Sequence, residues 1–379
     1  MKIYLDNANI GELEKKYVLD ALESGFISTR GPLIKVFEEK FGLYLGGYIS
    51  ATYSGTAALH LSVLYSMKKY GIKGEKIGGI LPAITFAATS HALLYNNVIP
   101  IFVDVDPHTW NIDPEKIPDL IELAKKNGID TKFIVPVHLY GNPADMDKIM
   151  NIAKIYDLVV IEDAAEALNS LYKGKFCGII GNFGAFSFNA NKVITASSGG
   201  AVFSKNQQDI EYIRFLTLQA RNESKGYYHE DLGFNYRMTN IEAAIILAQM
   251  EKLDYFCKLK KEFFKIYSFY LKEKVEFQKV LENCEHNYWL ISCKFNGIKV
   301  EDLIQKLSNF GIPTRRIFYP LPLMEFYKQY VEKYLNNYKV VDFYKNSLKI
   351  YENGLCLPSS TKNSLDAIEF VAKKISQLI

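Results

Sequence analysis

Three polar groups follow strand-like segments, and each could take part in chemistry. Lys192, in FSFNANKVITASSGG (186–200), is flanked by small residues; a lysine of lowered pKa can form a Schiff base, although most lysines in turns are solvated. Asp163 ends the apolar run LVVIEDA (158–164), where a carboxylate either meets a cationic partner or caps a helix. The SGTAA segment (54–58) offers N–H groups to a phosphate or simply begins a buried helix.

Taken together, the three groups match the demands of one cofactor. Pyridoxal 5'-phosphate needs an anchor for its phosphate, a counter-charge for its pyridinium nitrogen and an amine for its aldehyde. Residues 54–58, Asp163 and Lys192 supply these in turn. We therefore expect a pyridoxal phosphate site, although each group by itself has the ordinary structural explanation given above.

The elements around these groups must bring them to one place. Apolar runs at 47–54, 98–106, 132–141 and 158–164 alternate with helical segments, of which 55–71 is the first. Strands without polar alternation are typical of a sheet buried on both faces, and helical spacers imply parallel pairing through crossovers. The sequence therefore predicts an α/β fold, in which ligands gather at the carboxyl ends of the strands.

A second, smaller domain is expected toward the C-terminus, because 379 residues exceed what one hydrophobic core usually serves. Thr239 and Glu242 stand at capping-box spacing and begin a segment with helical periodicity for more than thirty residues. We predict one long helix there that bridges two domains. A strand over 287–296 and further helices follow. The predicted division is a large domain over residues 1–250 and a small α/β domain over residues 251–379.

Composition excludes several classes of function. The formal net charge of +3 gives no electrostatic reason to expect nucleic acid or an anionic membrane as a partner. The N-terminal segment lacks a signal peptide's apolar core, and no run of about eighteen apolar residues occurs, so no membrane span is expected. The five cysteines show no CxxC spacing, which is typical of reduced thiols rather than of disulfides or zinc ligands. We expect a soluble cytoplasmic protein without a metal site.

Seven short motifs carry a resemblance to a known family. In chain order they are GPLIKVFEEKFG, SGTAALHL, PAITFAATSHALLY, VHLYGNPADMD, EDAAEAL, FSFNANKVITASSGG and GFNYRMTNIEAAI. They resemble the successive motifs of the DegT/DnrJ/StrS nucleotide-sugar aminotransferases, and the resemblance runs from about residue 3 to the GLCLPSS segment near the C-terminus. It implies a fold type I aminotransferase: a large domain with a mostly parallel seven-stranded sheet flanked by helices, and a smaller C-terminal α/β domain.

Carried over to this sequence, the resemblance implies how the cofactor is held. Lys192 would form the Schiff base, and Asp163 would pair with the pyridinium nitrogen. Phe86 would stack on the ring, with an ordinary core phenylalanine as the alternative. Glu166 would lie near the phenolic oxygen or the substrate, with a surface glutamate on a helical turn as the alternative. The implied phosphate contacts are Thr56, Ala57 and Ser187, together with Asn235 from the neighbouring subunit of a homodimer.

The resemblance also implies a set of substrate-binding residues. Arg315 and Arg316 stand in the segment that meets the nucleotide in the family, where an arginine is generally followed by proline. Arg316 takes the place of that proline, which is a departure from the family pattern. The other implied contacts to the sugar or its diphosphate are His138, Tyr140, Tyr236 and Arg237.

The implied activity is transfer of the amino group of glutamate to the C4 keto group of a nucleotide-linked sugar, with release of 2-oxoglutarate. EDAAEAL and the Lys192 segment resemble the branch that acts on UDP-2-acetamido-4-keto-2,6-dideoxy sugars, of the UDP-N-acetylbacillosamine or legionaminic acid type, for cell-surface glycans. The alternatives are C3 amination of a dTDP- or GDP-linked sugar and a non-catalytic regulator that binds pyridoxal phosphate. Sister dehydratases have histidine at the lysine position, so Lys192 argues against them, and no GxGxxG motif supports a nicotinamide enzyme.

Overall fold

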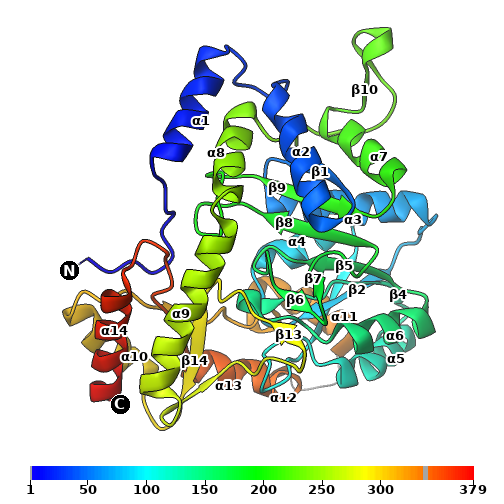
Figure 1. Cartoon of the computed structure of the whole chain (residues 1–379). Coiled ribbons are helices and arrows are strands. Elements are labelled where there is room, and N and C mark those ends of the chain that lie inside the picture. The colour runs from blue at the N-terminus through cyan, green and yellow to red at the C-terminus, as the bar shows by residue number, and fades with distance from the viewer. Residues whose placement is uncertain (1, 336–339) are drawn as a thin grey trace.

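The computed structural model describes residues 2–335 and 340–379, and a seven-stranded sheet forms its centre (Figure 1). The strand order is β1-β9-β8-β5-β4-β2-β3. Strand β9 is antiparallel to both neighbours, and the other adjacent pairs are parallel, so the predicted α/β class with a mostly parallel sheet is confirmed. The strands are β1 (Tyr48–Thr52), β2 (Ile77–Pro82), β3 (Ile99–Val103), β4 (Asp130–Ile134), β5 (Val159–Asp163), β8 (Phe183–Ser187) and β9 (Gly200–Ser204).

Helices cover this sheet because its strands are apolar on both faces. Every residue of β2, β3, β5 and β9 is buried, and strands of this kind need helices on both sides. Helix α3 packs on β5, β8 and β9, α5 packs on β3 and β4, and α2 and α7 contact β1. The helices of this region are α1 (Glu12–Glu23), α2 (Pro32–Leu45), α3 (Gly55–Lys69), α4 (Ala87–Tyr95), α5 (Ile117–Lys126), α6 (Met146–Tyr156), α7 (Gln207–Thr217) and α8 (Asn240–Met250).

Two predicted strands differ from the structure. The segment predicted as a strand over 47–54 forms β1, which pairs antiparallel with β9 at the sheet edge instead of joining the parallel series. The strand predicted over 132–141 ends at Ile134. Pro136 has no N–H to donate to a neighbouring strand, and a helical turn over Leu139–Gly141 with Tyr140 at a φ of 57° then redirects the chain.

A four-stranded antiparallel sheet of order β12-β14-β16-β15 forms the smaller domain. Helices α9 and α14 lie side by side against it (Figure 1), and Phe263, Leu303 and Val371 are buried in its core. The elements of this region are β12 (Val275–Phe277), β14 (Ile291–Phe295), β15 (Arg315–Arg316), β16 (Gly354–Leu357), α9 (Leu253–Leu271), α10 (Val300–Asn309), α13 (Lys345–Asn353) and α14 (Leu365–Leu378).

The segment predicted as one long helix is two helices, α8 and α9. Thr239 and Glu242 form the predicted capping box, but Lys252 has a φ of −103° and a ψ of −3°, so the helical geometry breaks there. The Lys252 ammonium forms an ion pair of 2.6 Å with the buried Glu14 of α1. This contact ties α1 to the kink at which the chain passes from α8 to α9.

Packing crosses the predicted domain boundary at 250/251 in both directions. Ile3 is buried in the core of the smaller domain, whereas α11 (Glu325–Leu335) packs Tyr327 and Val331 on the core of the large sheet. Within the described residues, no helix is both long and apolar enough to cross a bilayer. The remaining short elements are β6 (Leu171–Tyr172), β7 (Lys175–Phe176), β10 (Arg221–Asn222), β11 (Tyr228–His229), β13 (Cys284–Glu285) and α12 (Val340–Phe343).

Candidate active site

A cavity of about 510 Å³ lies at the carboxyl ends of the parallel strands, within the usual size range of small-molecule sites. One wall comes from the starts of α3 and α4 and the ends of β5 and β8. The other comes from Trp289, Arg315 and Phe318, which follow residue 251 in the chain. Among the residues that the sequence singled out, those that line the cavity are Thr56, Phe86, Asp163, Glu166, Ser187, Lys192 and Arg315.

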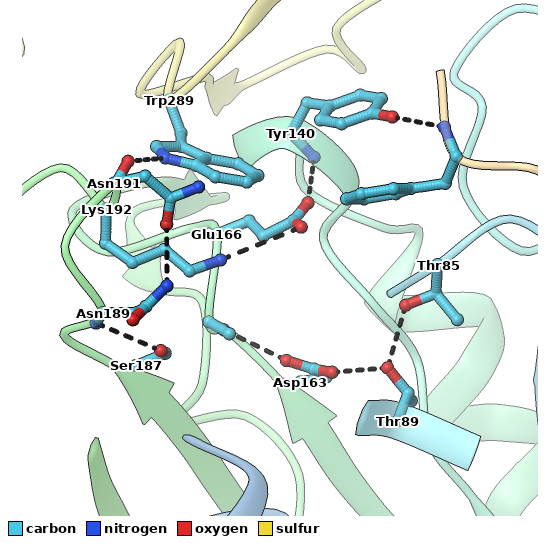
Figure 2. A network of polar contacts seen from close by, with 12 residues as sticks. Thr85, Thr89, Tyr140, Asp163, Glu166, Ser187, Asn189, Asn191, Lys192 and Trp289 are labelled. Atoms are coloured by element: carbon cyan, nitrogen blue, oxygen red, sulfur yellow. Dashed lines mark hydrogen bonds and ion pairs between the residues drawn. The ribbon is translucent and has the colours of Figure 1, made fainter. Parts of the chain in front are cut away.

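Lys192 enters the cavity from the loop between β8 and β9 (Figure 2). Its Nζ lies 4.0 Å from Glu166 Oε1 and 3.9 Å from the centroid of the Trp289 ring. Burial lowers the pKa of Lys192, and the carboxylates of Glu166 and Asp163 oppose part of that effect. An amine that loses its proton more readily than in water is suited to attack on an aldehyde and to proton transfer.

Asp163 ends β5 with its buried carboxylate at the cavity (Figure 2). Thr89 Oγ1 donates to Oδ2 at 2.7 Å, and the N–H of Ala165 donates to Oδ1 at 3.2 Å. The hydroxyls of Thr89 and Thr85 are 2.8 Å apart, which fixes the donor in turn. Burial raises the pKa of Asp163, and the hydrogen bond from Thr89 lowers it in part. A buried carboxylate in this setting is stabilised by a cation placed in the cavity.

The N-terminus of α3 forms the third predicted group. Ser54 caps the helix, and its Oγ accepts the N–H of Ala57 at 3.1 Å. The first-turn N–H groups of Gly55 and Thr56 have no partner within the helix, and the helix dipole favours an anion beside them. Ala57 does not line the cavity, and its N–H is already used by the cap.

Close packing shapes this end of the cavity. A Cβ on Gly55 would lie 2.7 Å from the Cβ of Ser187. A Cβ on Gly200 would lie 2.5 Å from the carbonyl carbon and oxygen of Ser54. Only glycine lets β8 and β9 approach the first turn of α3 this closely. The turn and the Ser187 hydroxyl therefore face the same space.

The predicted cofactor fits this arrangement. A helix N-terminus beside Ser187 suits a phosphate, the buried Asp163 carboxylate suits a pyridinium nitrogen, and Lys192 presents an amine to the same cavity. The three demands that predicted pyridoxal phosphate from the sequence are thus met by groups that line one cavity.

Glu166 is a buried carboxyl in a turn after β5, so the alternative of a surface glutamate on a helical turn is wrong. The N–H of Tyr140 donates to its Oε2 at 2.7 Å (Figure 2). Burial raises the pKa of Glu166 to about 7, and the nearby Lys192 ammonium opposes part of that effect. Glu166 can therefore take up or release a proton near neutral pH beside the Lys192 amine.

Phe86 and Arg315 lie at opposite walls of the cavity opening. Phe86 is 60% exposed, so the alternative of an ordinary core phenylalanine is wrong, and its ring lies 6.0 Å from the ring of Phe318. Arg315 forms an ion pair of 2.7 Å with Asp6, whose Oδ2 also accepts from the Asn191 side chain at 3.0 Å. Arg315 is thereby tied to the loop that carries Lys192.

His138 and Tyr140 are buried and do not line the cavity. His138 Nδ1 accepts the N–H of Ala144 at 3.0 Å, so its proton sits on Nε2, which lies 3.1 Å from Glu162 Oε2. Glu162 precedes Asp163 on β5, and alternate residues of a strand point to opposite faces. Glu162 and His138 therefore lie behind the sheet from the cavity. The Tyr140 hydroxyl accepts a backbone N–H from the smaller domain instead of facing the cavity.

Arg237 also lies outside the cavity of its own chain. Its Nη1 is 3.9 Å from Oε1 of the buried Glu38 and has no hydrogen-bond partner among the described residues. Arg214 Nε donates to the same carboxylate at 3.1 Å, and burial lowers the pKa of Arg237.

The three other predicted residues lie apart from the cavity as well. The ring of Tyr236 stacks on that of Phe234 with centroids 4.7 Å apart. Asn235 is exposed. Arg316 pairs with Glu301, and its Nη2 donates to a backbone carbonyl at 2.8 Å.

The sequence motifs did not single out Trp289, Phe318 or Thr89, although all three touch the cavity or its carboxylate. Thr85 and Thr89 stand four residues apart at the start of α4, which would have indicated hydroxyls on one face. Trp289 and Phe318 reach the cavity only through long-range packing of the C-terminal part of the chain on the large sheet, and no local pattern marks them.

Comparison with known proteins agrees with this architecture. Residues 8–376 match the family model described as the DegT/DnrJ/EryC1/StrS aminotransferase family. The GDP-perosamine synthase of Escherichia coli O157:H7 is 38% identical, with 96% of this chain and 95% of that protein aligned. The UDP-4-amino-4,6-dideoxy-N-acetyl-beta-L-altrosamine transaminase of Campylobacter jejuni is 32% identical, with 82% and 83% aligned.

A solved structure has the same overall fold as this chain. The crystal structure of a DegT DnrJ EryC1 StrS aminotransferase from Brucella abortus superposes with a TM-score of 0.87 at 26% identity, and the alignment covers 96% of this chain and 95% of that one. The predicted resemblance and fold are therefore confirmed. The chain belongs to the DegT/DnrJ/EryC1/StrS aminotransferase family and is a pyridoxal-phosphate-dependent aminotransferase.

Proposed function

We propose that this enzyme transfers the amino group of glutamate to the C4 keto group of a UDP-linked 4-keto-6-deoxy sugar used in cell-surface glycans. The observation that carries the proposal is the placement of Lys192, Asp163 and the N-terminus of α3 in one cavity between the two domains. Glutamate leaves as 2-oxoglutarate, and the amine takes the place of the keto oxygen on the sugar. The exchange therefore balances without an added oxidant or reductant.

When bound, pyridoxal phosphate supplies an aldehyde that carries the amino group and a ring that accepts electrons. Lys192 Nζ would take the proton from the α-carbon of glutamate and would later deliver a proton to C4 of the sugar. Because burial lowers the pKa of this amine, its basic form is reached at a lower pH than in water. Asp163 would hold the positive ring nitrogen, and Gly55, Thr56 and Ser187 would hold the phosphate.

The choice of sugar carrier rests on the relatives. The Campylobacter transaminase is named for a UDP-linked 4-amino-4,6-dideoxy sugar, which supports UDP and amination at C4. The GDP-perosamine synthase has the higher identity, 38%, and it supports a GDP-linked sugar as the second candidate. A further alternative is amination at C3 of a dTDP- or GDP-linked sugar, and the assay below distinguishes it from amination at C4.

We also propose a homodimer with shared active sites. Asn235 does not line the cavity of its own chain, and it follows a loop in which Tyr227 is 87% and Leu232 is 77% exposed. A projecting loop with exposed apolar residues is suited to contact a second copy of the chain, where Asn235 would meet the cofactor phosphate. Tyr236 and Arg237 follow directly and would approach the sugar of the partner in the same way.

The cysteines support the expected cytoplasmic location. All five are free thiols in the structure, and Cys177, Cys257, Cys293 and Cys356 are buried. Free buried thiols are typical of proteins that work in a reducing compartment.

The direct test supplies the purified enzyme with pyridoxal phosphate, glutamate and a panel of UDP-, GDP- and dTDP-linked 4-keto and 3-keto sugars. We expect 2-oxoglutarate in equal amount to a 4-amino UDP-sugar, identified by NMR. If the enzyme turns over only a GDP-linked sugar, GDP replaces UDP as the proposed carrier. If it turns over only a 3-keto sugar, C3 replaces C4 as the proposed position of amination. Absence of 2-oxoglutarate with every sugar, in protein that has bound the cofactor, would overturn it.

The role of Lys192 has its own test. Borohydride reduction of the cofactor-loaded protein followed by peptide mass spectrometry should find the label on Lys192, and Lys192→Ala should lose both the label and the visible absorbance band. Lys205→Ala changes an exposed lysine in the same region and serves as the matched control. A label on another side chain contradicts the assignment.

Shared active sites can be tested by mixing two inactive variants. Lys192→Ala and Asn235→Ala dimers, unfolded and refolded together, should regain about a quarter of the wild-type activity, since half of the dimers then hold one intact site. Two separately refolded variants are the control. No recovery in a mixture shown to contain mixed dimers would exclude a contribution of Asn235 from the neighbouring subunit.

A further inference from the structure

Trp289 contacts both the cavity lysine and the residue that precedes it (Figure 2). The centroid of its ring lies 3.9 Å from Lys192 Nζ, which is a cation–π distance. Its Nε1–H donates to the backbone carbonyl of Asn191 at 2.6 Å, one residue before the lysine. The side chain is 2% exposed. A single buried ring therefore restrains both the amine of Lys192 and the backbone that carries it.

The backbone of Trp289 is itself held by two buried side chains of the C-terminal part of the chain, Lys260 and Asn287. The buried Lys260 of α9 donates from Nζ to the carbonyl oxygens of Trp289 at 3.1 Å and Ser359 at 2.6 Å. Asn287 Oδ1 accepts the N–H of Trp289 at 2.8 Å. The amide nitrogen of Asn287 donates to the Glu166 carbonyl at 3.0 Å, in the turn that carries the cavity glutamate. Burial of an amine is unfavourable unless its hydrogen bonds are satisfied, and the Lys260 amine is satisfied by these two backbone carbonyls. The two hydrogen bonds restrain the backbone at Trp289 and Ser359.

We propose that Trp289 is a positioning residue for Lys192: its ring holds the amine and its N–H holds the Asn191 carbonyl, so that the lysine stays aimed into the cavity while it is not bonded to the cofactor. The inference rests on the role proposed above for Lys192. It extends that role because Trp289 follows the predicted boundary at 250/251, so that the C-terminal part of the chain sets the position of a lysine carried by the large sheet.

An ordinary core tryptophan would affect stability alone, and the two accounts differ in what they predict for the lysine. A ring face stabilises the ammonium form, whereas burial under the ring destabilises it, so removal of the ring should change the pH at which the Lys192 amine loses its proton. The charged groups that act on the same amine are Glu166, Asp163 and Asp6, which favour the ammonium, and Arg315, which disfavours it. All four remain in a Trp289 variant.

The first test uses the cofactor-free protein. Competitive acetylation across pH, followed by mass spectrometry of the Lys192 peptide, measures the pH at which this amine becomes reactive. Trp289→Leu should shift that midpoint by roughly half to one and a half pH units. Trp289→Phe keeps an aromatic face and should lie closer to the wild type. Trp110→Phe changes the second of the two tryptophans, also buried, and should leave the midpoint unchanged.

The second test uses the loaded enzyme. Trp289→Leu should lower kcat by roughly 10- to 100-fold with little change in KM for the sugar, because a displaced lysine slows proton transfer without weakening substrate binding. Trp289→Phe should recover part of the loss. If Trp289→Leu unfolds, the Phe variant still decides the matter, because it loses the N–H that donates to the Asn191 carbonyl and must therefore lower kcat by more than Trp110→Phe does.

The outcomes separate this inference from the proposed function. If the borohydride label is on Lys192 and neither Trp289 variant moves the midpoint or kcat more than Trp110→Phe does, Trp289 is a core residue and the inference fails alone. If the label is absent from Lys192, the proposed role of that lysine fails first, and the inference falls with it.

Discussion

Glu166→Gln is expected to stabilise the cofactor-free protein at alkaline pH and to change its stability little at acid pH. Glu166 is buried beside Lys192, and burial raises its pKa to about 7 from the ordinary value of 4.5. Glutamine keeps an oxygen that can accept the N–H of Tyr140, so the substitution removes the charge and retains the hydrogen bond.

The sign and size follow from proton linkage. Between pH 4.5 and about 7 the folded protein holds on Glu166 a proton that the unfolded chain has released, so the free energy of unfolding falls as pH rises through this window. At 1.36 kcal/mol per pKa unit, the shift corresponds to a penalty of about 3 kcal/mol above pH 7. The Lys192 ammonium opposes the rise in the pKa of Glu166. In a Lys192→Met background, Glu166→Gln should therefore raise the free energy of unfolding by more than it does in the wild type.

Urea unfolding of the cofactor-free wild type and variant at about pH 4.5, 6 and 8 measures the effect as a difference of free energies of unfolding. The difference should grow in favour of Glu166→Gln by about 3 kcal/mol from the lowest to the highest pH. Glu39→Gln removes an exposed glutamate and controls for net charge. A difference that stays constant over this range would refute the account of Glu166 as a buried carboxyl that ionises near neutral pH.

Three further substitutions probe the cavity and the packing around it. Gly200→Ala should destabilise the protein by about 1–3 kcal/mol and weaken cofactor binding in equilibrium dialysis, because the added Cβ would lie 2.5 Å from backbone atoms of Ser54. Gly11→Ala is the control, because the atoms nearest to its added Cβ would lie 3.7 Å away. Asp163→Asn should lower transamination about 100-fold or more while cofactor-free stability at pH 8, measured by urea unfolding, is kept or raised, since a buried charge is removed. Tyr140→Phe should cost about 1–3 kcal/mol in urea unfolding, because it leaves the Phe318 N–H without its acceptor; unchanged stability would contradict that bond.

Much of the fold could be predicted from local patterns. Apolar runs and helical spacers are properties of neighbouring residues, and they located the strands of a parallel sheet and most of its helices. The pairing of β1 with β9 joins segments about 150 residues apart, so no local pattern reports it. The break at Lys252 between α8 and α9 was missed for a similar reason, because the periodicity continues through it and the contact with Glu14 comes from the N-terminal helix.

Residue types at strand and helix ends were enough to predict the Lys192, Asp163 and Thr56 wall of the cavity, since the carboxyl ends of parallel strands meet at one edge. The same rule selected His138 and Tyr140, but it does not tell which face of the sheet a side chain meets. The position of the Tyr140 side chain depended on the reversal of the chain at that residue, and the position of His138 depended on its contact with the Glu162 carboxylate behind the sheet.

The sequence by itself determined which chemistry is available: a lysine, a carboxylate and a helix start suited to a phosphate, each set by local residue type. Only the tertiary structure decided what surrounds them. Trp289, Arg315 and Phe318 come from the C-terminal part of the chain and line the cavity opposite these groups. Electrostatics in a buried site depends on distance and desolvation, and both are created by long-range packing that one-dimensional spacing does not encode.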